Sequence, residues 1–163
     1  MALRKYQEAG LEPIFTRAKP AETDEEIKRH HRIELTVEGV PLGYAELYYF
    51  NKSIPSFLVH FVFIKKTVRG YGFGGAMMEE INDYITARGK MGILCNVIDS
   101  ASAAHGIYAA HGWHESSRSP HWMTINEPKN VIPEDVEKAI AYAMKWMEKI
   151  EKKTDEKEVR KAA

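Results

Sequence analysis

The segment from Val68 to Gly75, with the sequence VRGYGFGG, holds the residues with the clearest potential for chemistry. Because glycine has no Cβ, the backbone N–H groups of so glycine-rich a loop can converge on one bound anion. A strand-like apolar run precedes the segment and a helical pattern follows it, and a helix start adds a partial positive charge at the same place. The segment therefore predicts a pyrophosphate site, with a plain tight turn as the alternative.

Three nucleotide-binding motifs compete for this segment. A P-loop needs a lysine followed by serine or threonine at the start of the helix, but Ala76 and Met77 follow Gly75, which excludes that motif. Gly70, Gly72 and Gly75 satisfy the dinucleotide pattern G-x-G-x-x-G. That pattern belongs to a parallel βαβ sheet, whereas the strands expected before this loop are antiparallel and too little chain follows it. The third motif is Arg/Gln-x-x-Gly-x-Gly/Ala.

The elements that must position this loop follow from hydrophobic periodicity. Ile33, Leu35 and Val37 alternate with polar residues and end at a turn of Glu38 and Gly39, which predicts a strand of an antiparallel meander. Strands and helices then succeed one another, so we expect a mixed, mostly antiparallel α/β sheet flanked by helices. The elements expected outside this strand are a strand at 13–17, a helix at 24–30, strands at 42–50 and 57–65, a connection at 51–56, a helix from the glycine loop to Gly89, a strand at 91–97, a helix at 101–111, and strands at 113–116 and 122–126.

A single amphipathic helix is expected after residue 131. Pro133 suits the first position of a helix. We therefore divide the chain into a main domain at 1–130 and a C-terminal helix with a charged tail at 131–163, whose last residues we expect to fray. This helix either docks on its own domain or pairs with a partner, including a second copy in a homodimer. Its apolar seam consists of Val136, Ile140, Ala143, Met147 and Ile150.

Composition narrows the partners of the chain. Its 163 residues suit one domain, and 23 basic residues balance 23 acidic ones, which argues against a nucleic-acid binder that depends on bulk charge. No apolar run is long enough to span a membrane. The single cysteine, Cys95, excludes an intramolecular disulfide and favours the cytoplasm. It lies in an expected core strand, and the histidines lack metal-ligand spacing, so we expect no metal.

Two motifs in order carry a resemblance to a known family. Arg69, Gly72 and Gly74 fit the third motif, and here the sequence resembles the GNAT superfamily of acetyl-CoA-dependent N-acyltransferases. Downstream, the segment from Tyr108 to Trp113, YAAHGW, is similar to the Tyr-x-x-x-Gly-Phe/Trp segment of that family. Both motifs fall within about 57–116, inside the expected order of strands and helices. The resemblance implies a GNAT-like sheet whose central strands splay apart.

The resemblance also implies a site for acetyl-CoA. In the family, backbone amides of the glycine loop bind the pyrophosphate, and the strand before the loop holds the pantetheine arm and the acyl carbonyl. An amide near Phe63 would stabilise the oxyanion that forms on the thioester. The implied coenzyme residues are Val62, Phe63, Ile64, Arg69, Gly70, Tyr71, Gly72, Phe73, Gly74 and Gly75.

Transfer to nitrogen requires a base, because a protonated amine has no lone pair. His60 lies nine residues before Arg69, where the resemblance to arylalkylamine acetyltransferases places a catalytic histidine. Strand alternation puts it on the face opposite Phe61 and Phe63. The alternative is a hydrogen-bonded histidine of a buried strand. Glu46 is a second candidate, as a base, as a partner for a cationic amine or as an ordinary exposed strand residue.

Tyr108 is the implied general acid, donating a proton to the departing coenzyme A thiolate. The alternative is a core tyrosine of an amphipathic helix. Many relatives carry a base on the strand after the glycine-loop helix, where this chain has Asn96, and asparagine cannot serve as a base. We therefore expect an N-acetyltransferase that uses direct transfer in a ternary complex, with a small-molecule amine or a protein amine as acceptor. A catalytically weak acyl-CoA-binding module that acts on a protein partner is the alternative.

Overall fold

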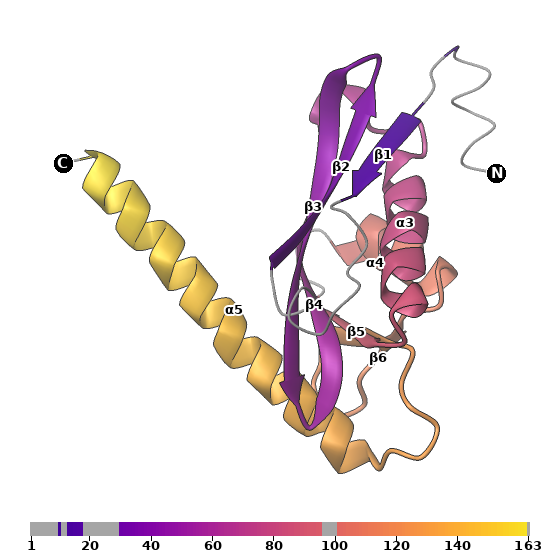
Figure 1. Cartoon of the computed structure of the whole chain (residues 1–163), viewed down its shortest axis with the longest axis vertical. Helices are drawn as coiled ribbons and strands as arrows, with labels where there is room; N and C mark the ends of the chain where they lie inside the picture. The colour runs from indigo at the N-terminus through magenta and orange to yellow at the C-terminus, as the bar shows by residue number, and fades with distance from the viewer. Residues whose placement is uncertain (1–9, 11–12, 18–29, 96–100, 163) are drawn as a thin grey trace.

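The computed structural model describes residues 10, 13–17, 30–95 and 101–162. Within them the chain forms a seven-stranded sheet with helices on both faces (Figure 1). The expected order of strands and helices is confirmed. The elements are β1 (Pro13–Arg17), β2 (His30–Val37), β3 (Val40–Lys52), β4 (Ile54–Ile64), the 3₁₀ turn η1 (Lys66–Val68), α3 (Phe73–Ala87), β5 (Met91–Cys95), α4 (Ala101–Ala110), β6 (His114–Glu115), β7 (Trp122–Ile125) and α5 (Pro133–Ala162).

The strands lie in the order β1-β2-β3-β4-β5-β7-β6. Every neighbouring pair is antiparallel except β4 and β5, which run parallel and are joined through α3. The mostly antiparallel sheet expected from the sequence is therefore confirmed. The one parallel pair lies at its centre, directly beside the glycine loop.

Two tight turns build the meander. Glu38 and Gly39 have φ angles of 51° and 78°, so the turn expected there is confirmed. The connection expected at 51–56 is wrong, because β3 runs to Lys52 and β4 begins at Ile54. Ser53 is the single residue between the two strands, and the chain reverses direction there with a φ of 68°. Pro55 lies inside β4 near its beginning, where a missing N–H is tolerated best.

Each face of the sheet has its own hydrophobic core. The first core lies between the sheet and α3, with α4 at its edge, and the second lies between the sheet and α5. Figure 1 shows α3 and α4 on one side of the sheet and α5 on the other. The apolar stripe expected for α3 is confirmed, since all five of its residues are buried: Met77, Met78, Ile81, Tyr84 and Ile85.

The helix α5 begins at Pro133, as its sequence predicts. Val136, Ile140 and Ala143 are buried in the second core, and Met147 packs against it, so the first half of α5 docks on its own sheet. The expected fraying is wrong for the backbone, because the helix continues to Ala162. The last turns contain mainly lysine, glutamate and alanine, which favour helix even without packing. In Figure 1 the C-terminal half of α5 extends away from the sheet.

Two expectations fall partly outside the described residues. The helix expected at 24–30 lies there except for His30, which is the first residue of β2. The strand expected at 91–97 is described as far as Cys95, and Asn96 lies outside. None of the helices in the part of the chain that the structure describes is long and apolar enough to cross a bilayer.

Candidate active site

β4 extends beyond its described pairing with β5. Within the described residues, the parallel pairing runs from Ser56 with Met91 to Val59 with Leu94, and β5 is described as far as Cys95. β4 continues for five more residues, still paired with β3 on its other side. Backbone groups on the β5 side of this segment have no partner among the described residues of β5, and such groups can bind an extended ligand.

A β-bulge marks the point of separation. Phe61 pairs with Glu46 and Val59 pairs with Leu47, so His60 has no partner in β3. The extra residue bends the strand and turns His60 and Phe61 to one face. The ring of His60 lies 5.8 Å from that of Tyr48 and 6.3 Å from that of Phe61. The expectation that His60 points away from Phe61 and Phe63 is wrong, because simple alternation fails across a bulge.

The glycine loop has the backbone of an anion site. Gly70 and Gly72 have φ angles of 92° and 84°, a region that other residues rarely adopt. Gly72 is the N-cap of α3, no side chain caps the helix, and its first turn has no acidic residue. The N–H of Ala76 donates to the carbonyl of Gly72 at 3.2 Å, so the amides of Gly74 and Gly75 lie ahead of the first bond of the helix.

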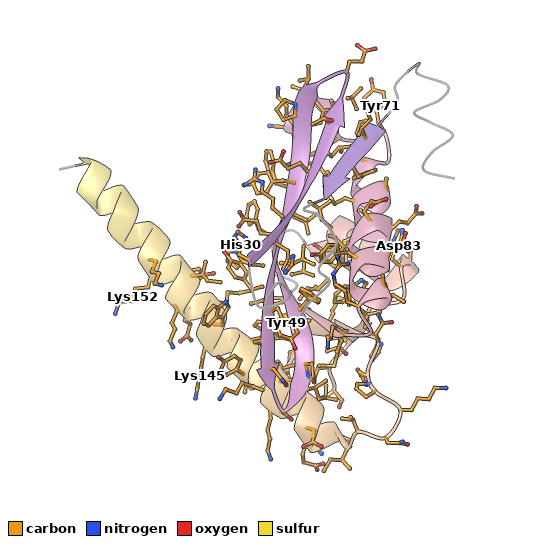
Figure 2. The ribbon with its side chains drawn as sticks, in the orientation of Figure 1. His30, Tyr49, Tyr71, Asp83, Lys145 and Lys152 are labelled. Carbon is orange, nitrogen blue, oxygen red and sulfur yellow. The ribbon has the colours of Figure 1, made fainter. Side chains whose placement is uncertain are left out.

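The residues of the glycine loop differ in their burial and in their contacts. The side chain of Phe73 is buried in the first core, so only its backbone can face a ligand, whereas Tyr71 is exposed (Figure 2). Arg69 Nε donates to the carbonyl oxygen of Ile64 at 3.1 Å. This bond ties the loop to the end of β4. Gly74 packs under α4, where an added Cβ would meet Ile107 at 3.6 Å.

The expected pantetheine strand presents side chains to both faces. Val62 and Ile64 pack against the first core. Phe63 lies on the other face, with its ring 5.6 Å from that of Tyr44. Their backbone belongs to the segment of β4 beyond its described pairing with β5. Contact with a coenzyme remains a prediction for all three residues.

His60 combines burial with an unused nitrogen. Its Nδ1 is buried and has no hydrogen-bond partner within the described residues. Burial lowers the pKa of His60, and the charge of His30 lowers it further, while the carboxylates of Glu46 and Glu151 oppose the shift. The imidazole is therefore uncharged at neutral pH and has a lone pair for a proton.

Tyr108 lies on the other side of the sheet. It belongs to α4 and packs against the first core, together with Ile107. Burial raises the pKa of the Tyr108 hydroxyl, so the group holds its proton at neutral pH and can donate it. His60 lies beside Tyr48 of the second core, so His60 and Tyr108 belong to opposite faces of the sheet.

The remaining candidates have simpler roles. Glu46 lies on the face of His60 and pairs with Arg32 at 3.5 Å and with His30 at 3.9 Å. Cys95 packs against the second core, and burial raises the pKa of its thiol. It is therefore a core residue, as expected. Over the described ranges, no three metal-binding side chains gather at one place.

Sequence patterns missed two residues of this site. Glu151 acts electrostatically on His60 from α5, and only the fold brings these distant residues together. Phe61 lies beside His60 on the open face. The spacing of Phe61 and Phe63, two residues apart with Tyr44 on the neighbouring strand, was the signal available for an aromatic surface.

Comparison with known proteins identifies the family and the fold. A model of the acetyltransferase (GNAT) domain matches residues 2–121. No curated protein matches the chain. Among solved structures, a GNAT family acetyltransferase from Elizabethkingia anophelis with acetyl-CoA bound has a TM-score of 0.54 at 9% identity, covering 69% of this chain and 97% of that one.

Two further neighbours have the same fold. Mutant forms of the spermidine/spermine N-acetyltransferase from Vibrio cholerae have a TM-score of 0.52 at 14% identity, covering 70% of this chain and 94% of theirs. A GNAT family structure from Desulfovibrio desulfuricans has a TM-score of 0.52 at 11% identity, covering 70% and 98%. The domain model covers most of the sheet and the glycine loop. This chain is therefore a member of the GNAT acetyltransferase family and an acyltransferase.

Proposed function

We propose that the chain is an N-acetyltransferase that moves an acetyl group from acetyl-CoA to a primary amine in a ternary complex. One observation carries the proposal. Beyond the described pairing of β4 with β5, an uncharged histidine lies on one face of the sheet, and a protonated tyrosine lies on the other. Direct transfer needs such a base and such an acid on either side of one thioester.

The coenzyme fits the glycine loop and the part of β4 that lies beyond its described pairing with β5. The amides of residues 70–75 bind the pyrophosphate at the start of α3, where the helix dipole favours negative charge. Phe73 contributes only its N–H, since its side chain is buried. The pantetheine arm lies along Val62, Phe63 and Ile64, and an amide near Phe63 stabilises the oxyanion. The acetyl-CoA found in the Elizabethkingia anophelis neighbour supports this donor.

Two proton transfers are assigned to His60 and Tyr108, which lie on opposite faces of the sheet. The nitrogen of the acceptor loses a proton to His60, directly or through water, as it attacks the thioester carbonyl. The tetrahedral intermediate collapses with cleavage of the C–S bond, and Tyr108 donates its proton to the coenzyme A sulfur. Each group acts in the protonation state that burial gives it at neutral pH.

The acceptor is an amine of a small molecule or of a protein. The Vibrio cholerae neighbour is named for spermidine and spermine, which supports a small-molecule amine. A homodimer through the outer half of α5 remains a prediction, as does the cytoplasm as the location.

Calorimetric titration with acetyl-CoA tests the coenzyme site, with NAD as the control ligand. Gly72→Glu places a carboxylate at the anion site and strains a residue whose φ is 84°, so we expect Kd to rise at least about 100-fold. Gly89→Glu is the matched variant, because Gly89 also has a positive φ, of 63°, with open space around it. It lies beyond the opposite end of α3 and should change Kd by less than about threefold.

Transfer is then followed by mass spectrometry of acetylated amines. Acetyl-CoA binding that Gly72→Glu and Gly89→Glu weaken equally would contradict the anion site. Binding without acetylation of any amine would instead favour the acyl-CoA-binding module that acts through a protein partner. Binding of NAD in preference to acetyl-CoA would overturn the coenzyme assignment altogether.

A further inference from the structure

Three aromatic side chains, which we call the aromatic patch, lie together on the open face of the sheet beside His60. The patch consists of Tyr44 on β3 with Phe61 and Phe63 on β4. The ring of Tyr44 lies 5.8 Å from that of Phe61 and 5.6 Å from that of Phe63, and the two phenylalanine rings are stacked 6.5 Å apart. The patch is therefore a continuous aromatic surface.

The aromatic patch is poorly covered. Phe61 is 45% exposed and Phe63 is 37% exposed, whereas phenylalanine on a sheet is usually buried. On the same face, α5 covers the neighbouring region, where the ring of Trp146 lies 6.4 Å from that of Tyr48. A contiguous apolar surface left open beside reactive groups is typical of a ligand site.

Charges around the aromatic patch limit the ligand to a low positive charge. The guanidinium of Arg32 lies 4.0 Å from the centre of the Tyr44 ring. It also pairs with Glu34 at 3.0 Å and with Glu46 at 3.5 Å. Among the described residues that contact Tyr44 or its partner Arg32, two carboxylates and one guanidinium leave a net charge of about one negative unit. Glu151 on α5 adds a carboxylate that acts on His60. A single ammonium group can use Glu46 and the π faces, whereas the small negative charge of these described residues does not balance a polyamine with several charges.

We propose that the acceptor is a primary amine with one positive charge and a flat apolar body, which rests on the aromatic patch while its nitrogen reaches His60. This inference rests on the proposed function and adds the substrate class. His60 and Phe61 are consecutive and turn to the same face through the bulge. A ring stacked on Phe61 therefore places an amine on a short linker near the imidazole.

Acetylation of 2-phenylethylamine, ethylamine, spermidine and a lysine peptide tests the inference, with release of coenzyme A as the readout. Wild-type kcat/KM should be about 30-fold higher for 2-phenylethylamine than for ethylamine, because the phenyl ring leaves water. Phe61→Ala should reduce kcat/KM for 2-phenylethylamine about 5- to 10-fold and leave ethylamine within about twofold. Phe61→Tyr, which keeps the ring, should restore the preference.

Val40→Ala is the matched control. Val40 is an exposed apolar residue of β3, on the same strand as Tyr44 and away from the aromatic patch. Its kinetic constants should stay within about twofold of the wild type. Because Phe61 is half exposed, Phe61→Ala should fold normally, and its melting temperature checks that it does.

The outcomes separate the substrate class from the activity. Faster acetylation of spermidine or the lysine peptide than of 2-phenylethylamine would overturn the inference and leave the transferase. Calorimetric binding of 2-phenylethylamine that weakens in Phe61→Ala, without acetylation, would support the aromatic patch and overturn the proposed function. Absence of both binding and acetylation would overturn both.

Discussion

Burial can tune a histidine and a tyrosine for opposite tasks. Removing a charge from water is costly, so burial favours the uncharged imidazole of His60 and the uncharged hydroxyl of Tyr108. The first is a base with a free lone pair, and the second is an acid with a proton to give. One physical effect thus acts on both members of the proposed acid–base pair.

The pH dependence of transfer follows from these two shifts. At saturating amine, kcat/KM for acetyl-CoA should rise with pH through an apparent pKa below 6.5, because His60 loses its proton there. It should fall only above pH 10, where Tyr108 ionises. His60→Gln should remove the acidic limb and lower kcat about 100-fold. Tyr108→Phe should remove the alkaline limb and lower kcat about 10-fold or more.

Binding measurements and one control complete this test. Both variants should bind acetyl-CoA with a Kd near that of the wild type, since neither side chain holds the pyrophosphate. His114→Ala is the matched control, because His114 is exposed on β6 and pairs with Glu127 at 2.6 Å. It should leave kcat and the pH profile unchanged. An acidic limb that persists in His60→Gln would assign the base to another group.

At the scale of the element, β4 produces the site through its pairing rather than its composition. A nearly continuous apolar run predicted β4 as a strand, but alternation along it placed His60 on the wrong face. A bulge depends on the register between β3 and β4, which local sequence does not encode. Local sequence predicts more about its neighbour β5. Met91 and Ile93 are buried as their apolar run predicts, but the extent of the pairing between β5 and β4 again depends on both strands.

Substitution of Gly43 tests how closely β3 must approach the end of β4. An added Cβ would lie 2.5 Å from the carbonyl oxygen of Phe63 and 2.9 Å from Ile64 Cδ1. Gly43→Ala should therefore shift the end of β4 and lower the free energy of unfolding by about 1–3 kcal/mol, measured by urea denaturation. It should also raise the Kd for acetyl-CoA, because the shifted segment is the proposed pantetheine site.

Gly106→Ala is the matched substitution for this experiment. Gly106 lies inside α4 with nothing within 4 Å of an added Cβ. Alanine should there raise the free energy of unfolding by up to about 1 kcal/mol, because glycine is a poor helix former. Equal stability of Gly43→Ala and the wild type would mean that β3 and β4 can separate freely, against the tight pairing that the site requires.

At the scale of the whole molecule, α5 completes a sheet that would otherwise have one bare face. The seam of this helix could be predicted from sequence, but its partner could not, because the same stripe suits its own sheet or another chain. The first half of the seam packs on its own sheet, against the buried residues Phe50, Leu58 and Ile93. α5 also brings Trp146 beside Tyr48, which contacts His60, and brings Glu151 close enough to act on His60, so the helix that covers the sheet also borders the proposed base.

Ile140 and Met144 separate the docked side of α5 from its open side within one turn. Ile140 is fully buried, whereas Met144 is 42% exposed. Ile140→Ala should lower the free energy of unfolding by about 3 kcal/mol, which corresponds to roughly 10 °C in melting temperature at this size. Met144→Ala should change it by less than about 0.5 kcal/mol. Similar losses in both variants would mean that α5 is covered on both sides in solution, as in a homodimer, and a melting temperature that rises with protein concentration would confirm that state.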